Sequence, residues 1–199
     1  MDFFIESFIA LTLIEQLALI SGIKLLLLSE LMLFFACFWC YINFRFIGSV
    51  LLLFYFPLLS CYSFPIPFAN LLILLFSSLP IQCSQIFIKT GFLNYSIEGL
   101  GQSLSAGFYF IILQCKEFIY SYFTLTDSLI GSIYYFTTGL HGFHVLIGSF
   151  LFYIIIFYIM FSSIYPFYFM EFYFSLFLSS YYWHFVDFIW FIVFLLFII

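Results

Sequence analysis

Two of the three histidines, His141 and His144, lie three residues apart in a long apolar run. On a helix this spacing places both side chains on one face. The pair could supply two ligands to a metal ion, but a closed site requires three or four, and no nearby cysteine or carboxylate completes the set. The alternative is that both are neutral, hydrogen-bonded groups at a helix contact, where Gly139 and Gly142 let a neighbour approach closely. We favour the helix contact and expect no metal site.

The third histidine, His184, precedes Asp187 by three residues in a second apolar run. An acid near the middle of a membrane span costs about 2.5–3.5 kcal/mol on insertion scales unless it is paired or protonated, and His184 is the nearest partner in the sequence. The pair could relay protons, but a structural pair that fixes its helix in a bundle is the better interpretation. Trp183 and Trp190, like Trp39, are expected to pack between helices or to lie at the membrane interface.

Glu30 lies about two turns beyond Lys24 in the first long apolar run. It shares no helical face with another charge in that run, so it is the strongest single candidate for proton chemistry. The alternative is a protonated glutamate that bonds to a histidine on another helix, and the sequence leaves both open. Cys37 and Cys40 have redox-like C-x-x-C spacing but lie in mid-helix without a βαβ context, so we expect packed cysteines.

The composition indicates whether these residues are surrounded by water or by lipid. With 67% hydrophobic residues, 7% charged residues and a mean hydropathy of +1.27, the chain has more apolar surface than a soluble domain can bury. Short strands of alternating apolar and polar residues are absent, which favours helices over a membrane barrel. The net charge of −5 leaves no basic patch that could bind a phosphate backbone, so nucleic acid is excluded as a partner.

Five stretches have the roughly 20 mostly apolar residues that a spanning helix requires. The sequence therefore predicts an all-α membrane protein, a bundle of five transmembrane helices, over residues 22–44, 68–88, 104–122, 129–161 and 172–198. Residues 1–21 form a separate apolar segment, interfacial or covered by a partner, ahead of a 22–199 domain. Residues 46–59 are too short to span and are expected to be re-entrant or packed on a neighbour, and the polar residues 90–103 are expected to form a loop.

The first 20 residues carry acids but no lysine or arginine, unlike a secretory or transit peptide, so we expect an organelle-encoded product. Lys24 and Lys89 fall on the N-terminal side of the spans and Arg45 on the other. This count predicts that the N-terminal side faces the matrix or cytoplasm.

The motifs around the histidines resemble those of one family closely. They comprise residues 107–114, Glu117, Phe123, Thr124, Asp127, Gly131, Ser132, Thr138, Gly139, His141, Gly142, His144, Val145, Ile147, Gly148, residues 182–187 and Trp190, and upstream residues 29–31, Phe34, Phe35, Phe38, Trp39, Asn70, Ser77 and Ser78. Over roughly residues 23–199 the chain resembles subunit III of the mitochondrial cytochrome c oxidase, a haem-copper respiratory oxidase.

The resemblance implies a non-redox core subunit of complex IV that packs on subunit I, holds lipid and supports proton uptake or oxygen access. The complex passes electrons from cytochrome c to dioxygen and pumps protons. Haem a, haem a3 and copper would lie in partner subunits I and II, with no metal or catalytic residue in this chain. Bound phospholipid, cardiolipin in particular, accessory subunits and the mitochondrial inner membrane are also implied. The site residues would be Glu30, His141, His144, His184 and Asp187, with Trp39, Gly139, Gly142, Trp183 and Trp190 at lipid-cleft or packing positions.

The chain also departs from the family pattern. Gly22 begins where the family's third span would, so the first two helices are expected to be absent and a separate chain or other subunits to replace them. Phe177 stands where the family usually has a glutamate, and Glu171 is out of register. One alternative is subunit III of a quinol oxidase, although the glutamate at position 30 favours the cytochrome c branch. Another is an ion transporter or proton-channel subunit, which would require a mid-span arginine, whereas Arg45 lies at a span end.

Overall fold

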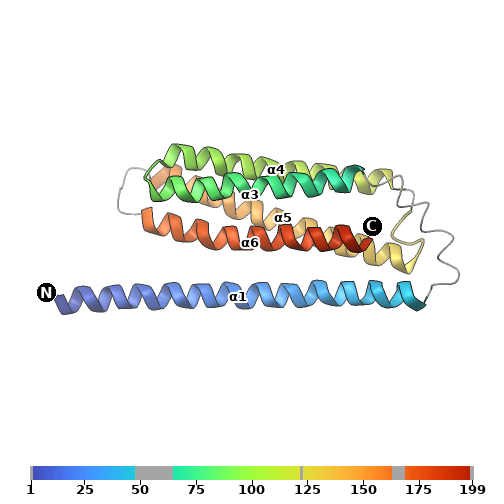
Figure 1. Ribbon diagram of the computed structural model, residues 1–199, viewed down its shortest axis with the longest axis horizontal. Helices are drawn as coiled ribbons and strands as arrows, with labels where there is room; N and C mark the ends of the chain where they lie inside the picture. The colour runs from blue at the N-terminus through green and yellow to red at the C-terminus, as the bar shows by residue number, and fades with distance from the viewer. Residues whose placement is uncertain (1, 48–64, 122, 163–168, 198–199) are drawn as a thin grey trace.

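The computed structural model describes the backbone of residues 2–47, 65–121, 123–162 and 169–197, and the side chains of residues 14–46, 65–121, 123–161 and 172–197. Within these ranges the chain forms five helices and no strand: α1 (Asp2–Ile47), α3 (Pro65–Lys89), α4 (Leu93–Tyr120), α5 (Leu129–Ser162) and α6 (Phe169–Phe197). Figure 1 shows them side by side along the long axis of the molecule.

Four of these helices contain a segment that is long and apolar enough to cross a membrane: Ile14–Phe46, Pro65–Lys89, Leu129–Phe161 and Phe172–Phe197. The prediction of an all-α membrane protein is therefore confirmed. The remaining helix, α4, contains most of the expected span 104–122. It is 28 residues long and packs along α3, but its N-terminal half carries several polar residues and it is not among those segments. Its role as a fifth span stays a prediction.

The predicted loop at residues 90–103 is wrong. Thr90, Gly91 and Phe92 form a tight turn, and α4 begins at Leu93. Gly91 has a φ of +83°, and the amide of Phe92 donates to the carbonyl of Phe87 across 2.9 Å, as in a glycine-terminated helix. Glycine adopts this left-handed conformation without strain, so a single residue reverses the chain between α3 and α4.

Small residues on one side of α4 after this turn are buried against other helices instead of facing water. Ser96 and Ser103 are fully buried on one side of α4, and the Ser103 hydroxyl donates to the carbonyl of Ser77 across 3.2 Å. A Cβ atom on Gly99 would lie 2.9 Å from the carbonyl oxygen of Pro80. Small and polar side chains let two membrane helices approach closely, so here polarity marks a helix contact and not a loop.

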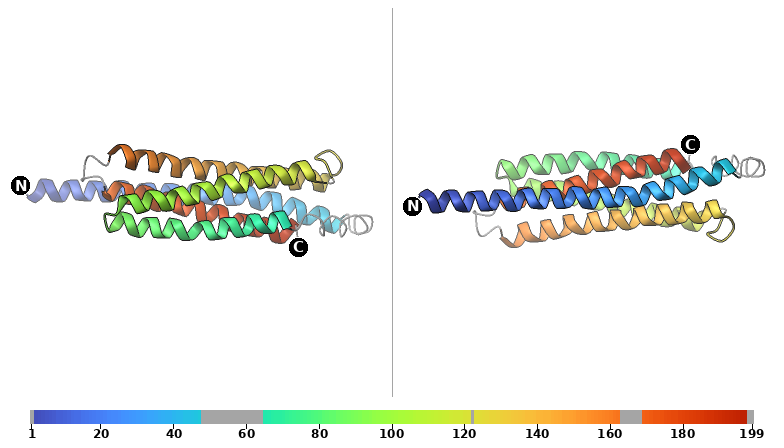
Figure 2. Two further views of the ribbon diagram at one scale, coloured as in Figure 1. Left: turned by 90° about the horizontal axis from the view of Figure 1, so that it is seen from above. Right: turned by 90° about the horizontal axis from the view of Figure 1, so that it is seen from below.

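The break expected between residues 21 and 22 does not interrupt the helix, because α1 runs continuously from Asp2 to Ile47. Its contacts are with α5 and α6, between which it lies in the second view of Figure 2. Phe34, Phe38 and Tyr41 are buried at helical spacing, and Glu30 lies one turn before Phe34 on the same face. Whether residues 1–21 lie at an interface or under a partner stays a prediction, and the expected re-entrant run at 46–59 lies almost wholly outside the described residues.

The side chains of Asp127 and Ser128 organise the turn before α5. The Ser128 hydroxyl accepts from the amide of Gly131 across 3.0 Å and takes the capping position. Asp127 instead accepts from the backbone amide of Thr124 across 2.6 Å. This hydrogen bond to the ionised form holds the pKa of the exposed Asp127 carboxyl below its ordinary value.

The predicted orientation stays a prediction, and the positions of the positive charges do not support one side over the other. The C-terminal ends of α1 and α4 lie at the same end of the bundle (Figure 1). Arg45 is in the last turn of α1, and Lys116 lies about one turn before the end of α4. Lys116 therefore joins Arg45, the charges divide two against two, and they favour neither side.

Candidate functional site

A polar link joins three helices at Glu30, His144 and Tyr182. Glu30 Oε2 on α1 lies 3.3 Å from His144 Nε2 on α5. The other ring nitrogen, His144 Nδ1, lies 2.8 Å from the hydroxyl of Tyr182 on α6. A neutral histidine that carries its hydrogen on Nε2 fits both neighbours, because Nδ1 then accepts from the tyrosine hydroxyl. The contact with Glu30 is within ion-pair distance but lacks hydrogen-bond alignment, so the neutral ring lies beside the carboxylate without a hydrogen bond to it.

The side chains of this link differ in how far they are exposed. His144 and Tyr182 are both buried, and the ring of Phe34 packs 5.4 Å from the His144 ring. The Glu30 side chain is 29% exposed at the surface of α1. The carboxylate therefore reaches the surface of the described chain, while the histidine and tyrosine behind it are shielded.

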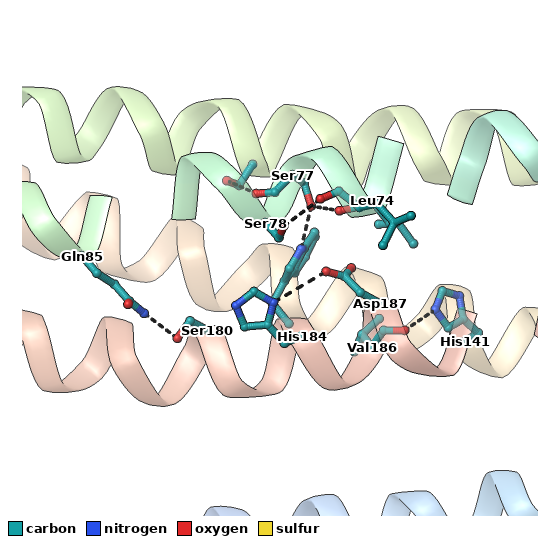
Figure 3. A network of polar contacts seen from close by, with 12 residues as sticks. Leu74, Ser77, Ser78, Gln85, His141, Ser180, His184, Val186 and Asp187 are labelled. Atoms are coloured by element: carbon teal, nitrogen blue, oxygen red, sulfur yellow. Dashed lines mark hydrogen bonds and ion pairs between the residues drawn. The ribbon is translucent and has the colours of Figure 1, made fainter. Parts of the chain in front are cut away.

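His141 is held separately from His144. Its Nε2 lies 3.1 Å from the backbone carbonyl of Val186 on α6, as Figure 3 shows. A carbonyl only accepts, so Nε2 carries the hydrogen. The fully buried ring packs on Trp190 and Phe110, at centroid distances of 4.8 and 5.2 Å. Although both histidines lie on the inner side of α5, they meet different partners and do not converge on one point.

His184 and Asp187 on α6 form a weak pair. His184 Nδ1 lies 4.0 Å from Asp187 Oδ2, at the outer limit of an ion pair (Figure 3). The aspartate side chain is buried, but the histidine side chain is 41% exposed. The other carboxyl oxygen, Asp187 Oδ1, has no hydrogen-bond partner among the described residues. The spacing thus brings the two residues together without satisfying the acid.

Trp183 lies at the centre of the bundle and contacts the other three packed helices. Its indole N–H donates to the Ser77 hydroxyl on α3 across 2.8 Å. Cβ atoms on Gly107 of α4 and Gly148 of α5 would lie 2.9 and 2.8 Å from its ring. The expected packing role of Trp183 therefore has a specific geometry, in which two glycines make room for one indole. Trp39, by contrast, is 58% exposed on α1.

Gly139 and Gly142 do not have the expected neighbour within the described chain. A Cβ atom at either position would meet nothing within 4 Å. Gly139 lies on the exposed stripe of α5, away from the stripe that carries His141, Val145 and Gly148. No described helix makes the predicted close approach at these two glycines, so a neighbour there stays a prediction.

Sequence reasoning missed several polar contacts because their partners are far apart in the chain. Tyr182 lies 38 residues from His144. The Tyr134 hydroxyl on α5 donates to Glu117 Oε1 on α4, and Gln85 Nε2 on α3 donates to the Ser180 hydroxyl on α6 across 2.6 Å (Figure 3). A buried polar residue in each apolar run was the available signal, but it does not name the partner.

The residues present do not fit a haem or copper site. Among the described residues, no three or more of histidine, cysteine, aspartate and glutamate gather closely enough to hold a metal ion. His141 Nε2 bonds to a backbone carbonyl, and His144 lies between Glu30 and Tyr182. We therefore assign no electron-transfer step to these side chains.

Comparison with known proteins places the chain in a family. The family model described as cytochrome c oxidase subunit III matches residues 8–199, a range that includes most of the N-terminal segment set apart above. A cytochrome c oxidase subunit 3 from Cyanidium caldarium is 33% identical over 182 residues, which cover 90% of this chain and 66% of that protein.

Two animal proteins of the same name agree with this match. The Enteroctopus dofleini protein is 36% identical over 131 residues, which cover 64% of each chain. The Drosophila melanogaster protein is 33% identical over 175 residues, 85% of this chain and 64% of the relative. The chain thus spans slightly less than two thirds of the length of these relatives. On the family match and the order of its motifs, the chain belongs to the cytochrome c oxidase subunit III family.

Proposed function

We propose that the chain is the non-redox core subunit III of a respiratory cytochrome c oxidase in the mitochondrial inner membrane. In this role it packs on subunit I, with subunit II and accessory subunits nearby. Electron transfer from cytochrome c to dioxygen takes place at haem a, haem a3 and copper centres in the partner subunits. Family membership supports the proposal, and so does the lack of fit between this chain's described side chains and a metal site.

The observation that carries a role beyond packing is the link from Glu30 to His144. A partly exposed carboxylate on a membrane helix is costly unless the protein uses or stabilises it. The His144 ring lies 3.3 Å from this carboxylate, and its other nitrogen bonds to the Tyr182 hydroxyl. The ring therefore has a defined position beside Glu30. Glu30 then acts as a proton-exchanging group at the subunit surface that supports proton uptake by the complex. His141, His184 and Asp187 act as buried polar contacts between helices.

The outer surface of α1 is the proposed location of lipid and of neighbouring chains. It exposes a run of large apolar side chains, including Leu25, Met32, Phe35 and Trp39. Acyl chains of phospholipid, with cardiolipin as the expected species, or helices of another polypeptide would cover this surface.

The test is Glu30→Gln in the assembled complex, which keeps the side-chain shape and removes the charge. We expect unchanged haem content and weaker sustained turnover or proton uptake. Glu98→Gln is the matched control, because Glu98 is an exposed acid on α4 outside this link. Loss of haem in Glu30→Gln would make Glu30 purely structural, and unchanged turnover would remove it from proton uptake.

Two other functions remain as alternatives to be measured. A quinol oxidase would differ in its electron donor, whereas the relatives reported above are named for cytochrome c. An ion transporter or proton-channel subunit would purify without haem. An optical spectrum of the assembly that contains this chain separates the three, since haem a absorption excludes the transporter and the oxidation of added cytochrome c excludes the quinol enzyme.

A further inference from the structure

A second group of buried polar side chains lies among α3, α4, α5 and α6 and takes no part in the Glu30 link. Each member has at least one polar side-chain atom with no hydrogen-bond partner among the described residues. These atoms are Asn70 Nδ2 and Oδ1, Gln114 Nε2 and Oε1, Glu117 Oε2, His141 Nδ1 and Trp190 Nε1. All five side chains are buried, and three of them are fully inaccessible. Unpaired buried polar atoms are rare, so their concentration in one bundle requires an explanation.

Helix α4 carries two of these groups on one face and contacts two others. Phe110, Gln114 and Glu117 are all buried and follow one another at helical spacing, so they occupy one face over about 10 Å. The Phe110 ring contacts both His141 and Trp190, at centroid distances of 5.2 and 4.9 Å. His141 and Trp190 therefore lie at the level of Phe110, one turn from Gln114 and two turns from Glu117.

The register of α3 against α4 places Asn70 at the level of Phe110 along the bundle. The Ser103 hydroxyl on α4 bonds to the carbonyl of Ser77 on α3, and the two helices run in opposite directions. Seven residues further along α4 is Phe110, and seven residues back along α3 is Asn70. Equal steps from a shared contact place Asn70 beside the turn of α4 that leads to Gln114.

The unpaired atoms are complementary in chemistry. The hydrogen on His141 Nε2 goes to the carbonyl of Val186, which leaves Nδ1 as an acceptor. Trp190 Nε1 is a donor only, and its ring centroid is 4.8 Å from that of His141. The side-chain amides of Asn70 and Gln114 each offer both functions. A small molecule that donates and accepts at once could satisfy neighbouring members of this group together.

Burial restricts what that molecule can be. Asn70, His141 and Trp190 have no exposed surface, so neither a lipid head group nor a residue of a partner subunit can reach them from outside. Water is small enough, and buried waters typically make about three hydrogen bonds to polar groups that are otherwise unpaired.

We propose that this face of α4 is an internal water-binding track. It runs from Trp190 and His141, past Asn70 and Gln114, to Glu117 and its donor Tyr134. The track is separate from the Glu30 link and does not depend on the proposed function. It connects the buried carboxyl of Glu117, near the C-terminal end of α4, to the centre of the bundle through exchangeable hydrogen bonds.

Two dry arrangements compete with the track. The amides of Asn70 and Gln114 could rotate and bond directly to each other. The indole N–H of Trp190 could instead point into the ring of Phe110, since the two rings meet edge to face at 88°. Each arrangement satisfies some members of the group without water, so the experiment must distinguish them from the track.

The first measurement is a density map of the chain in its native membrane assembly, at a resolution that shows ordered water. We expect separate density peaks about 2.7–3.2 Å from Trp190 Nε1, from His141 Nδ1 and from the Gln114 amide. A direct Asn70–Gln114 hydrogen bond, or the Trp190 indole seated on Phe110 with no peak beside it, would overturn the proposal.

The second measurement is radical footprinting in the same assembly, in which radicals formed from bound water oxidise the side chains beside it. Trp190 and Trp183 are a matched pair, because both are fully buried but the Trp183 N–H already donates to Ser77. We expect Trp190 to be oxidised several-fold faster than Trp183, and Gln114→Leu to reduce that difference. Gln102→Leu, at an exposed position on α4, should leave it unchanged. Equal oxidation of the two tryptophans would contradict a water site at Trp190.

Discussion

The indole N–H of Trp183 on α6 donates to the hydroxyl of Ser77 on α3, 106 residues away in the chain. The Ser77 hydroxyl in turn donates to the carbonyl of Leu74 across 2.6 Å, so it serves both groups at once. The Trp183 ring occupies the space left by Gly107 on α4 and Gly148 on α5. One side chain thus sets the spacing of four helices.

Replacing Ser77 should destabilise the bundle. Ser77→Ala leaves the Trp183 N–H buried without an acceptor, which costs about 1–3 kcal/mol. We expect a lower unfolding midpoint when the assembly is titrated with denaturant. Ser78→Ala is the control, because the exposed Ser78 hydroxyl bonds only to Leu75 in its own helix. Equal midpoints for the two variants would show that the bond to Trp183 contributes nothing.

Two glycines of α5 should respond in opposite ways to added volume. Gly148→Ala places a Cβ atom 2.8 Å from the Trp183 ring, and overpacking of this kind costs about 1–3 kcal/mol. Gly139→Ala meets open space within the described chain and improves helix propensity by up to about 1 kcal/mol. Thermal unfolding of the purified variants measures both effects.

The same pair reports on neighbouring molecules. If Gly139→Ala does not destabilise this chain but reduces recovery of the assembled complex, a partner helix packs at Gly139. Normal assembly of Gly139→Ala would instead leave that surface to lipid.

Removing the Tyr182 hydroxyl should affect Glu30 indirectly. Tyr182→Phe keeps the ring and deletes the bond to His144 Nδ1, which is worth about 0.5–1.5 kcal/mol. His144 then has less restraint beside Glu30, and we expect a shifted pH profile of turnover with a smaller loss than in Glu30→Gln. Tyr181→Phe, at the exposed neighbouring position, is the control. Identical pH profiles for the two phenylalanine variants would remove Tyr182 from the link.

The turn that precedes α5 should loosen in acid. The hydrogen bond from Thr124 lowers the pKa of Asp127 in the folded chain, so its contribution is fully present above the unfolded value of about 3.9. As the pH falls through the lower folded pKa, the carboxylate is protonated and the contribution is lost. Hydrogen exchange at residues 123–128 measured across this range should rise at low pH. In Asp127→Asn the rise should be absent, because that side chain does not titrate there.

The sequence predicted helix positions well wherever apolar residues ran without interruption. The expected span at 129–161 corresponds to α5, and that at 172–198 to α6, within a few residues at each end. It failed where polar or small residues face another helix. A polar, glycine-containing run such as residues 90–103 predicts a loop, although here Gly99 and Ser103 are the small and polar groups that the contact with α3 needs.

The sequence predicted which polar residues belong to the site better than it predicted their partners. Glu30, His141, His144 and Asp187 could be selected from the sequence because a polar group in lipid is expensive and therefore informative. Spacing on one helix correctly placed His184 next to Asp187. It could not show that Tyr182 holds His144, or that the glycines beside a tryptophan are Gly107 and Gly148, not Gly139 and Gly142.

Composition and periodicity were sufficient to predict a helical membrane protein, because the requirement to bury apolar surface in lipid acts on every residue of a run, and the motifs carried the resemblance to the subunit III family. The motifs were sufficient to select the polar residues. The partners of those residues, the rotation of each helix and the exposure of Glu30 followed from packing, since they depend on which faces of distant helices meet. Contacts such as those of Trp183 with Ser77 and of Glu30 with His144 have no local signature, so they could be found only in the folded bundle.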